Sequence, residues 1–81
     1  MYKDEELLGK EVIDASGELL GEVLEITMVD DVPCMLVGER KFLASKERVV
    51  RYNAIKVPYY EIASADDVII LRKSREEIRI L

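Results

Sequence analysis

The alternation of apolar and polar residues along the chain predicts short β-strands separated by turns. The apolar runs are short and rich in β-branched residues, which favour extended backbone. Turn residues interrupt them at intervals of about 8 to 12 residues, the spacing typical of a small sandwich or barrel. We therefore expect an all-β fold with strands at Lys10–Asp14, Leu19–Val29, Cys34–Gly38, Val49–Val57 and Asp67–Leu71.

The longest of these stretches, Leu19–Val29, departs once from simple alternation. Glu22 is at an even position and Glu25 at an odd one. Because side chains alternate between the two faces of a strand, a regular strand would place these two charges on opposite faces. A bulge or a strong bend between Gly21 and Glu25 restores the pattern, and glycine inside a strand often marks such a place. We predict that Gly21 lets this strand bend, as a small barrel requires.

Turn residues separate the other predicted strands. Gly17 is able to take a positive φ between the first two strands. Asp30–Pro33 predicts the next turn, because proline cannot donate to a strand ladder. Pro58 ends the fourth strand and begins a turn or a single helical turn. Residues 39–48 lose the strand pattern, and we expect a helical turn around Phe42–Ala44.

The last nine residues, 73–81, form a charged and aliphatic tail beyond a domain of residues 1–72. Ser74 followed by Glu77 fits a helix capping box, whereas the residues after Glu77 also fit an extended strand. The aliphatic residues of the tail either dock on the domain's own core or bind another chain, by strand addition or by insertion into a groove. They are Ile78, Ile80 and Leu81.

Composition places the chain among small globular domains. It has 81 residues, of which 49% are hydrophobic and 36% charged. It is too apolar for a disordered chain and too charged for a membrane protein, and no apolar run approaches the ~18 residues of a spanning helix. The acidic N-terminus does not fit a signal peptide. The lone Cys34 cannot form an internal disulfide, so we expect a reducing, cytoplasmic location.

The small size and the charge distribution both favour association with a partner. A single core of this size supplies only about 3–5 kcal/mol. The net charge is −5, but residues 1–40 hold eleven acids and three bases, whereas residues 41–81 hold six acids and nine bases. Overall acidity argues against nonspecific nucleic-acid binding. The asymmetry leaves open a basic patch in the second half, or two copies that meet acidic face to basic face, or simply a solvated surface.

The residue types that support catalysis or metal binding are scarce. The chain has no histidine and one cysteine, so the usual general base and the usual zinc ligands are missing. The paired acids Asp30-Asp31 and Asp66-Asp67 lack the glycine-spaced pattern of a calcium loop and more simply solvate turns. Cys34 opens an apolar run, which suits a buried, inert thiol. We expect no catalytic residue, no metal site and no cofactor.

Tyr59 and Tyr60 are the candidate binding aromatics. They adjoin a basic stretch that contains Arg48, Arg51 and Lys56, and such a combination can hold single-stranded RNA. More often, adjacent tyrosines divide between the core and the surface, and tyrosine is favoured at protein interfaces. We therefore predict a role of the two tyrosines in partner binding and regard nucleic acid as the weaker alternative.

Four sequence segments, in this order, resemble a PRC-barrel domain over about residues 5–72. They are L-L-G-K-E-V-I-D-A-S-G-E-L-L-G-E-V (Leu7–Val23), M-L-V-G (Met35–Gly38), I-K-V-P-Y-Y-E-I (Ile55–Ile62) and D-D-V-I-I-L (Asp66–Leu71). The resemblance implies a small barrel of about five to six antiparallel strands with a short helical turn. It also implies structural roles for Gly17 and Gly21 and for Pro58, whose turn would deliver Ile62 to the core.

PRC-barrel domains occur in three settings that bear on function. One is the C-terminal domain of a bacterial ribosome-maturation factor, which binds a small-subunit ribosomal protein. Another is the cytoplasmic part of the photosynthetic reaction-centre H subunit. The third comprises short stand-alone archaeal proteins, some of which are cell-division adaptors that bind the membrane-associated anchor of the division ring. The short chain is most similar to the third type, although Lys41–Arg51 lacks the glycine-rich insertion that many archaeal members carry.

The resemblance implies a non-catalytic adaptor for protein–protein interaction. We expect a homodimer, or a heterodimer with a related PRC-barrel protein, and a division-ring membrane-anchor protein as the partner. On this hypothesis the protein is cytoplasmic, does not insert into the membrane, and reaches the inner membrane face at the division site through its partner. The alternative is a ribosome-maturation or RNA-associated assembly factor.

Overall fold

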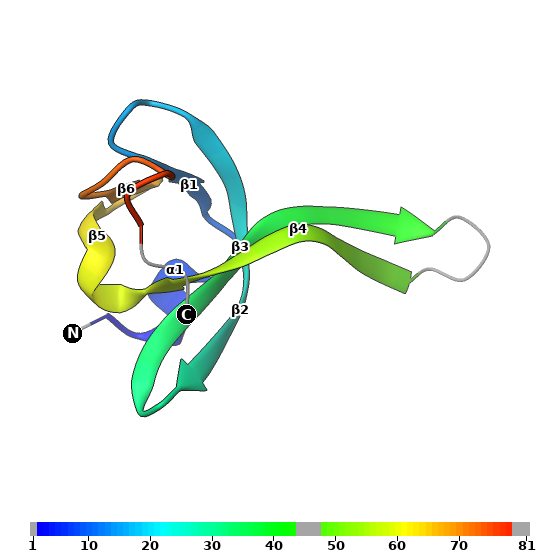
Figure 1. Ribbon diagram of the computed structural model, residues 1–81. Coiled ribbons are helices and arrows are strands. Elements are labelled where there is room, and N and C mark those ends of the chain that lie inside the picture. Colours follow the sequence, from blue (N-terminus) through cyan, green and yellow to red (C-terminus); the bar gives the residue numbers. More distant parts are fainter. Residues whose placement is uncertain (1, 44–47, 79–81) are drawn as a thin grey trace.

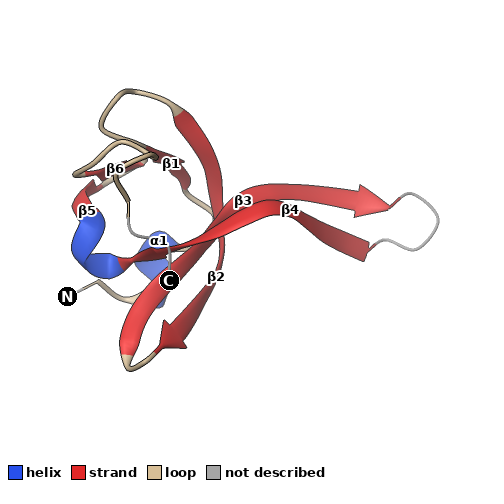
Figure 2. Cartoon of the chain, viewed as in Figure 1, coloured by secondary structure: helices blue, strands red, loops and turns tan. Residues whose placement is uncertain are grey.

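The computed structural model describes residues 2–43 and 48–78, which form six strands and two short helical turns (Figures 1 and 2). The predicted all-β fold with a short helical turn is confirmed. The elements are α1 (Asp4–Leu7), β1 (Glu11–Ile13), β2 (Leu19–Val29), β3 (Val32–Leu43), β4 (Arg48–Pro58), the 3-10 turn η1 (Tyr59–Glu61), β5 (Ile62–Ala65) and β6 (Ile69–Leu71).

All six strands belong to one curled sheet in the order β4-β3-β2-β1-β6-β5. The sheet is not closed, because its end strands β4 and β5 do not pair with each other. The expectation of purely antiparallel strands is wrong for one pair: β1 and β6 are parallel, with Val12 opposite Ile69. Only strands joined by a hairpin must be antiparallel, and these two are separated by four other strands along the chain.

The third strand is longer than the sequence pattern suggested. The helical turn expected around Phe42–Ala44 is wrong for Phe42 and Leu43, which belong to β3, while Ala44 lies outside the described residues. Leu43 pairs with Arg48 of β4, so the backbone hydrogen bonds of the hairpin hold this charged segment extended. Asp30 and Asp31 both have positive φ values, 48° and 66°, which suits a tight hairpin turn between β2 and β3.

The predicted bulge in β2 is confirmed. Val23 pairs with Val37 and Glu25 pairs with Leu36, which leaves Leu24 as the extra residue of β2. The bulge lets the adjacent Val23 and Leu24 both be buried. Near its start, β2 also passes very close to β3: a Cβ atom built on Gly21 would lie 2.6 Å from the carbonyl oxygen of Gly38. Gly21 has a φ of +139°, so glycine is required there on two grounds.

A single hydrophobic core lies inside the curled sheet. Its buried residues come from α1, from every strand and from the segment after β6: Leu7, Val12, Val23, Met35, Val37, Val57, Ile62, Ile69, Leu71 and Ile78. Pro58, which is itself buried, precedes η1, and this turn delivers Ile62 to the core as predicted. Ile78, which the sequence analysis assigned to a C-terminal tail, is therefore part of this core.

Beyond Gly38, β3 and β4 continue together as a two-stranded ribbon that projects from the body (Figure 1). We call residues 39–43 and 48–53 the arm. The last residue of β3 that pairs with β2 is Gly38, opposite Glu22, so no third strand within residues 2–43 and 48–78 pairs with the arm. One extra residue in β4 shifts the register between Val37 and Glu39, where the arm leaves the body. A two-stranded ribbon by itself is at best marginally stable in water.

Candidate protein-interaction surface

Two observations on the described residues concern metal binding and the reactivity of the thiol. Residues 2–43 and 48–78 contain no group of three metal-ligating side chains. Cys34 is fully buried at the start of β3, and its Sγ lies 3.5 Å from the carbonyl oxygen of Val32. Burial raises the pKa of this thiol, because it disfavours the thiolate. The Cys34 side chain is therefore a protonated packing group at neutral pH.

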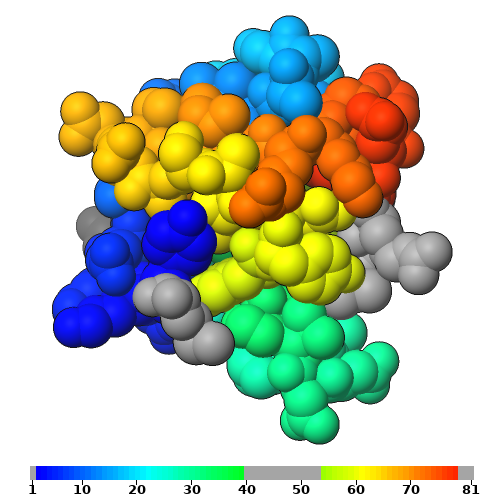
Figure 3. All heavy atoms as spheres, turned by 90° about the vertical axis from the view of Figure 1, so that its left-hand side faces the viewer, coloured from blue at the N-terminus to red at the C-terminus, as the bar shows by residue number. Residues whose placement is uncertain are grey.

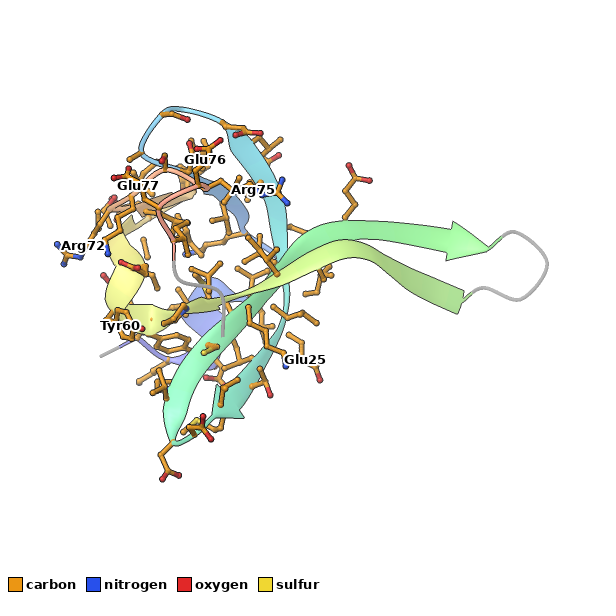
Figure 4. The ribbon with its side chains drawn as sticks, in the orientation of Figure 1. Glu25, Tyr60, Arg72, Arg75, Glu76 and Glu77 are labelled. Atoms are coloured by element: carbon orange, nitrogen blue, oxygen red, sulfur yellow. The ribbon has the colours of Figure 1, made fainter. Side chains whose placement is uncertain are left out.

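The 3-10 turn η1 separates the two candidate tyrosines. Tyr59 packs against the core, and its hydroxyl donates a hydrogen bond of 3.2 Å to Asp4 Oδ1. Burial, together with the negative charge of Asp4, raises the pKa of Tyr59 to about 12. Tyr60 is 56% exposed and points away from the body (Figure 4). Of the two tyrosines, only Tyr60 has a side chain that is largely accessible from solvent and so available for binding.

The other predicted site residues divide between the core and the undescribed end. Ile78 is 5% exposed and belongs to the core, so this conformation does not offer it to another chain. The Ser74 hydroxyl donates to Glu77 Oε1 at 2.9 Å and the Ile78 amide donates to the Ser74 carbonyl at 3.1 Å, so the capping interaction holds one helical turn. Ile80 and Leu81 lie outside the described residues.

The turn after β1 is organised by Asp14, which sequence analysis did not single out. Its carboxylate is 2% exposed and accepts four hydrogen bonds: from Ser16 Oγ (2.7 Å), from the amides of Ser16 and Glu18 (2.9 Å each), and from the amide of Arg75 (2.8 Å). The hydrogen bond from Ser16 makes the largest contribution in lowering its pKa from 3.8 to about 2, against the effect of burial.

Asp14 thus joins the β1–β2 turn to the C-terminal segment and has a structural role. The local part of this arrangement has a sequence signal, since an Asp two or three residues before Ser and Gly is typical of a side-chain-stabilised turn. Gly17 completes the turn with a φ of +90°. The bond to Arg75 spans 61 residues and has no such signal.

A second buried carboxylate, Glu61, links η1 to the segment after β6. Glu61 is 3% exposed, and its Oε2 lies 3.6 Å from Nζ of Lys73. Its backbone carbonyl accepts a 2.8 Å hydrogen bond from the Arg72 amide. Figure 3 shows the yellow spheres of the η1 region near the centre of one face, between the blue N-terminal segment and the orange segment that follows β5. A glutamate between a tyrosine and an isoleucine carries no sequence signal for such burial.

Exposed apolar side chains are scattered over the described surface. The large ones are Leu8, Leu19, Met28 and Tyr60, which belong to different elements or to opposite ends of one strand. Singly exposed apolar residues of this kind are common on soluble proteins and do not by themselves define a binding site. Backbone edges are the more distinctive feature of this molecule.

The two end strands of the sheet present backbone groups with no strand neighbour among the described residues. On the body, the free edge of β4 carries Lys56 and Pro58, two residue types that discourage strand addition. The free edge of β5 carries Ala63 and Ser64, which are exposed, small and uncharged. Beyond Glu39, the two strands of the arm pair only with each other among the described residues. Such edges can bind an extended segment of another chain.

A small β-sheet module with open edges is therefore the class that the fold and the surface define. The chain matches the family model of the PRC-barrel domain over residues 1–78, and it belongs to the PRC-barrel family. The resemblance noted from the four sequence segments is thus confirmed at the level of the family. None of the curated proteins compared with the chain matches it.

Proposed function

We propose that this protein is a non-catalytic adaptor that binds other proteins through the open edges of its sheet. The observation that carries the proposal is the arrangement of β4, β5 and the arm, whose outer edges have no strand neighbour in the described part of the chain. Membership of the PRC-barrel family supports an interaction module of this size. The Tyr60 side chain adds an exposed aromatic contact beside β5.

The process that we propose is archaeal cell division, on the basis of the resemblance to short stand-alone archaeal members. In this role the protein would form a homodimer, or a heterodimer with a related PRC-barrel protein, and bind the membrane anchor of the division ring. Contact with the membrane would be indirect. No helix in residues 2–43 or 48–78 is long and apolar enough to cross a membrane.

A role in ribosome maturation or RNA-associated assembly is the second candidate, and the charge of the arm favours it. The arm contains four bases and one acid, including Arg48 and Arg51, and Lys56 follows on the same strand. An RNA-binding role predicts affinity that falls steeply with salt and is lost when these three bases are neutralised. The adaptor role predicts a weaker dependence on salt.

An affinity experiment with the full-length chain separates the two candidates. The tagged protein is used to capture partners from nuclease-treated extract of the source organism, and the captured proteins are identified by mass spectrometry. We expect division-ring or membrane-anchor proteins, and their recovery should survive the nuclease. Recovery of ribosomal proteins alone, or of nothing above the tag control, would overturn the adaptor role in division.

A truncated variant tests the tail hypothesis in the same experiment. Because Ile78 belongs to the core, a deletion that begins at residue 73 would damage the fold itself. A deletion of residues 79–81 removes Ile80 and Leu81 and leaves Ile78 in place. If the two aliphatic residues bind a partner, this variant recovers less of it at unchanged thermal stability. Equal recovery would exclude them from the interface.

A further inference from the structure

Glu61 is a buried carboxylate whose hydrogen bonding is incomplete. It is 3% exposed, and its Oε2 has no hydrogen-bond partner in residues 2–43 and 48–78. The Nζ atom of Lys73 forms an ion pair with Oε2 at 3.6 Å, a separation beyond the usual range of an N–H···O hydrogen bond. A buried acceptor without a donor is unfavourable, so a cationic donor that reached Oε2 would gain a charge-assisted hydrogen bond.

The Lys73 side chain is a removable cover over this carboxylate. It is 50% exposed, whereas the Glu61 side chain that it pairs with is only 3% exposed. The lysine therefore reaches from the solvent to the buried oxygen. Its stem is flexible and its ammonium is strongly hydrated, so the head group can turn out into water. That movement would vacate the path to Oε2 and leave it open to another cation.

An exposed aromatic ring lies beside Glu61 on the same turn. Tyr60, which is 56% exposed, precedes Glu61 in η1. Figure 4 shows Tyr60 on the same side of the molecule as Arg72, whose amide donates the 2.8 Å hydrogen bond to the Glu61 carbonyl. This side faces the viewer in Figure 3, where the η1 region lies near the centre. A long cationic side chain that reached Glu61 could also lie against the Tyr60 ring.

Of the cationic groups in proteins, the guanidinium of arginine fits these two side chains best. It presents its donors as a rigid, planar fork that can bond both oxygens of a carboxylate, and its flat face stacks on aromatic rings. It is also less strongly hydrated than an ammonium, which makes it better suited to a buried ion pair. Arginine and tyrosine are both enriched among the residues that dominate binding energy at protein interfaces.

We propose that Glu61 and Tyr60 form an anchor site for an arginine of a partner protein, which enters by displacing the Lys73 ammonium. The proposal rests on the adaptor function above and names the chemical group by which a partner is recognised. In the complex the guanidinium bonds Glu61 Oε2 and stacks on Tyr60, while Lys73 turns into solvent. Glu61 directly precedes Ile62, the first residue of β5, so the anchor lies at the start of the open β5 edge.

A titration with a small arginine probe, followed by nuclear magnetic resonance, tests the site directly. N-acetyl-arginine methylamide is added to the isotopically labelled full-length chain, and the signals of the Glu61 carboxyl carbon and the Tyr60 ring are recorded. N-acetyl-citrulline methylamide, which has a similar shape but no charge, is the control probe. We expect both signals to shift and saturate with the arginine probe at millimolar concentrations, as suits a ligand of so few atoms, and not with the citrulline probe.

Three variants and one control test the role of each side chain. Lys73→Ala should bind the probe about fivefold more tightly or better, because the probe no longer competes with a tethered cation. Arg75→Ala removes one charge from the same segment, at an exposed side chain that lies away from Tyr60 (Figure 4), and should not change the affinity. Glu61→Gln should abolish binding, and Tyr60→Ala should weaken it about threefold. Far-UV circular dichroism checks the fold of each variant, and the exposed Tyr60 position keeps the test decisive if Glu61→Gln does not fold.

Tighter binding by Lys73→Ala is the result that a purely structural ion pair would not produce. The proposal is overturned if neither wild type nor Lys73→Ala gives a saturable shift at Glu61, if the citrulline probe shifts the same signals, or if Arg75→Ala tightens binding as much as Lys73→Ala. Failure here is distinct from failure of the adaptor function. A chain that captures division proteins from extract without binding the probe would keep the function and remove the anchor, whereas a chain that binds the probe and captures no partner would do the reverse.

Discussion

Replacing Gly21 with alanine is the sharpest test of the close approach between β2 and β3. The added Cβ would lie 2.6 Å from the carbonyl oxygen of Gly38, 2.7 Å from its carbonyl carbon and 2.9 Å from its Cα. All three are backbone atoms of a paired strand, so no side-chain rotation relieves the contact. Overpacking of this kind costs about 1–3 kcal/mol, and an unfavourable positive φ costs about 1–3 kcal/mol more.

We therefore expect Gly21→Ala to lower the free energy of unfolding by about 2–6 kcal/mol, a range that includes the ~3–5 kcal/mol that a core of this size supplies. The variant should be largely unfolded at neutral pH. Gly17→Ala is the matched control, because Gly17 has a φ of +90° but a Cβ added there would meet no atom within 4 Å. It should lose only the conformational part, about 1–3 kcal/mol.

Urea unfolding followed by far-UV circular dichroism measures both variants against wild type. A shift of the midpoint without a change of slope reports stability alone. If Gly21→Ala and Gly17→Ala are destabilised equally, the two strands do not approach as closely as described. That result would also remove the explanation given for the bend in β2.

Three further predictions concern buried side chains. Ile78→Ala should lower the free energy of unfolding by about 2–5 kcal/mol, measured by urea unfolding, and a negligible loss would place Ile78 outside the core. The fold lowers the pKa of Asp14 from its ordinary value of 3.8 to about 2. The ionised carboxylate therefore stabilises the folded state above about pH 4, and this stabilisation is lost as the pH falls from 4 toward 2. Asp14→Asn should flatten the dependence of unfolding on pH in that window, and an unchanged dependence would count against the network. Cys34 should react with a thiol reagent only after unfolding, because burial both shields the thiol and raises its pKa; rapid labelling of the native chain would refute this.

The parts of the fold that local chemistry determines could be predicted from the sequence. The bend in β2 was predictable from nearby residues. Gly21 lies inside the strand, and the spacing of Glu22 and Glu25 breaks the alternation of a regular strand. The turn after Pro58 was predictable because proline fixes the backbone and removes a donor. The division of the two tyrosines between core and surface was also one of the stated alternatives.

The parts that depend on distant partners could not be predicted. Residues 39–43 are mostly charged, and they are extended only because β4 pairs with them. The parallel pairing of Val12 with Ile69 joins segments that share no local signal. The burial of Glu61 likewise follows from the position of the segment after β6, which no residue near Glu61 encodes.

The central claim is that the open edges of this sheet are its binding surfaces. Hydrogen exchange of the wild-type chain, read by mass spectrometry at low and high protein concentration, tests it most directly. The account predicts that amides of the arm and of β5 exchange more slowly at high concentration, while those of β1 and β2 do not change. Equal exchange of the arm and β5 at both concentrations, in samples whose mass has doubled, would place the interface elsewhere and contradict the claim.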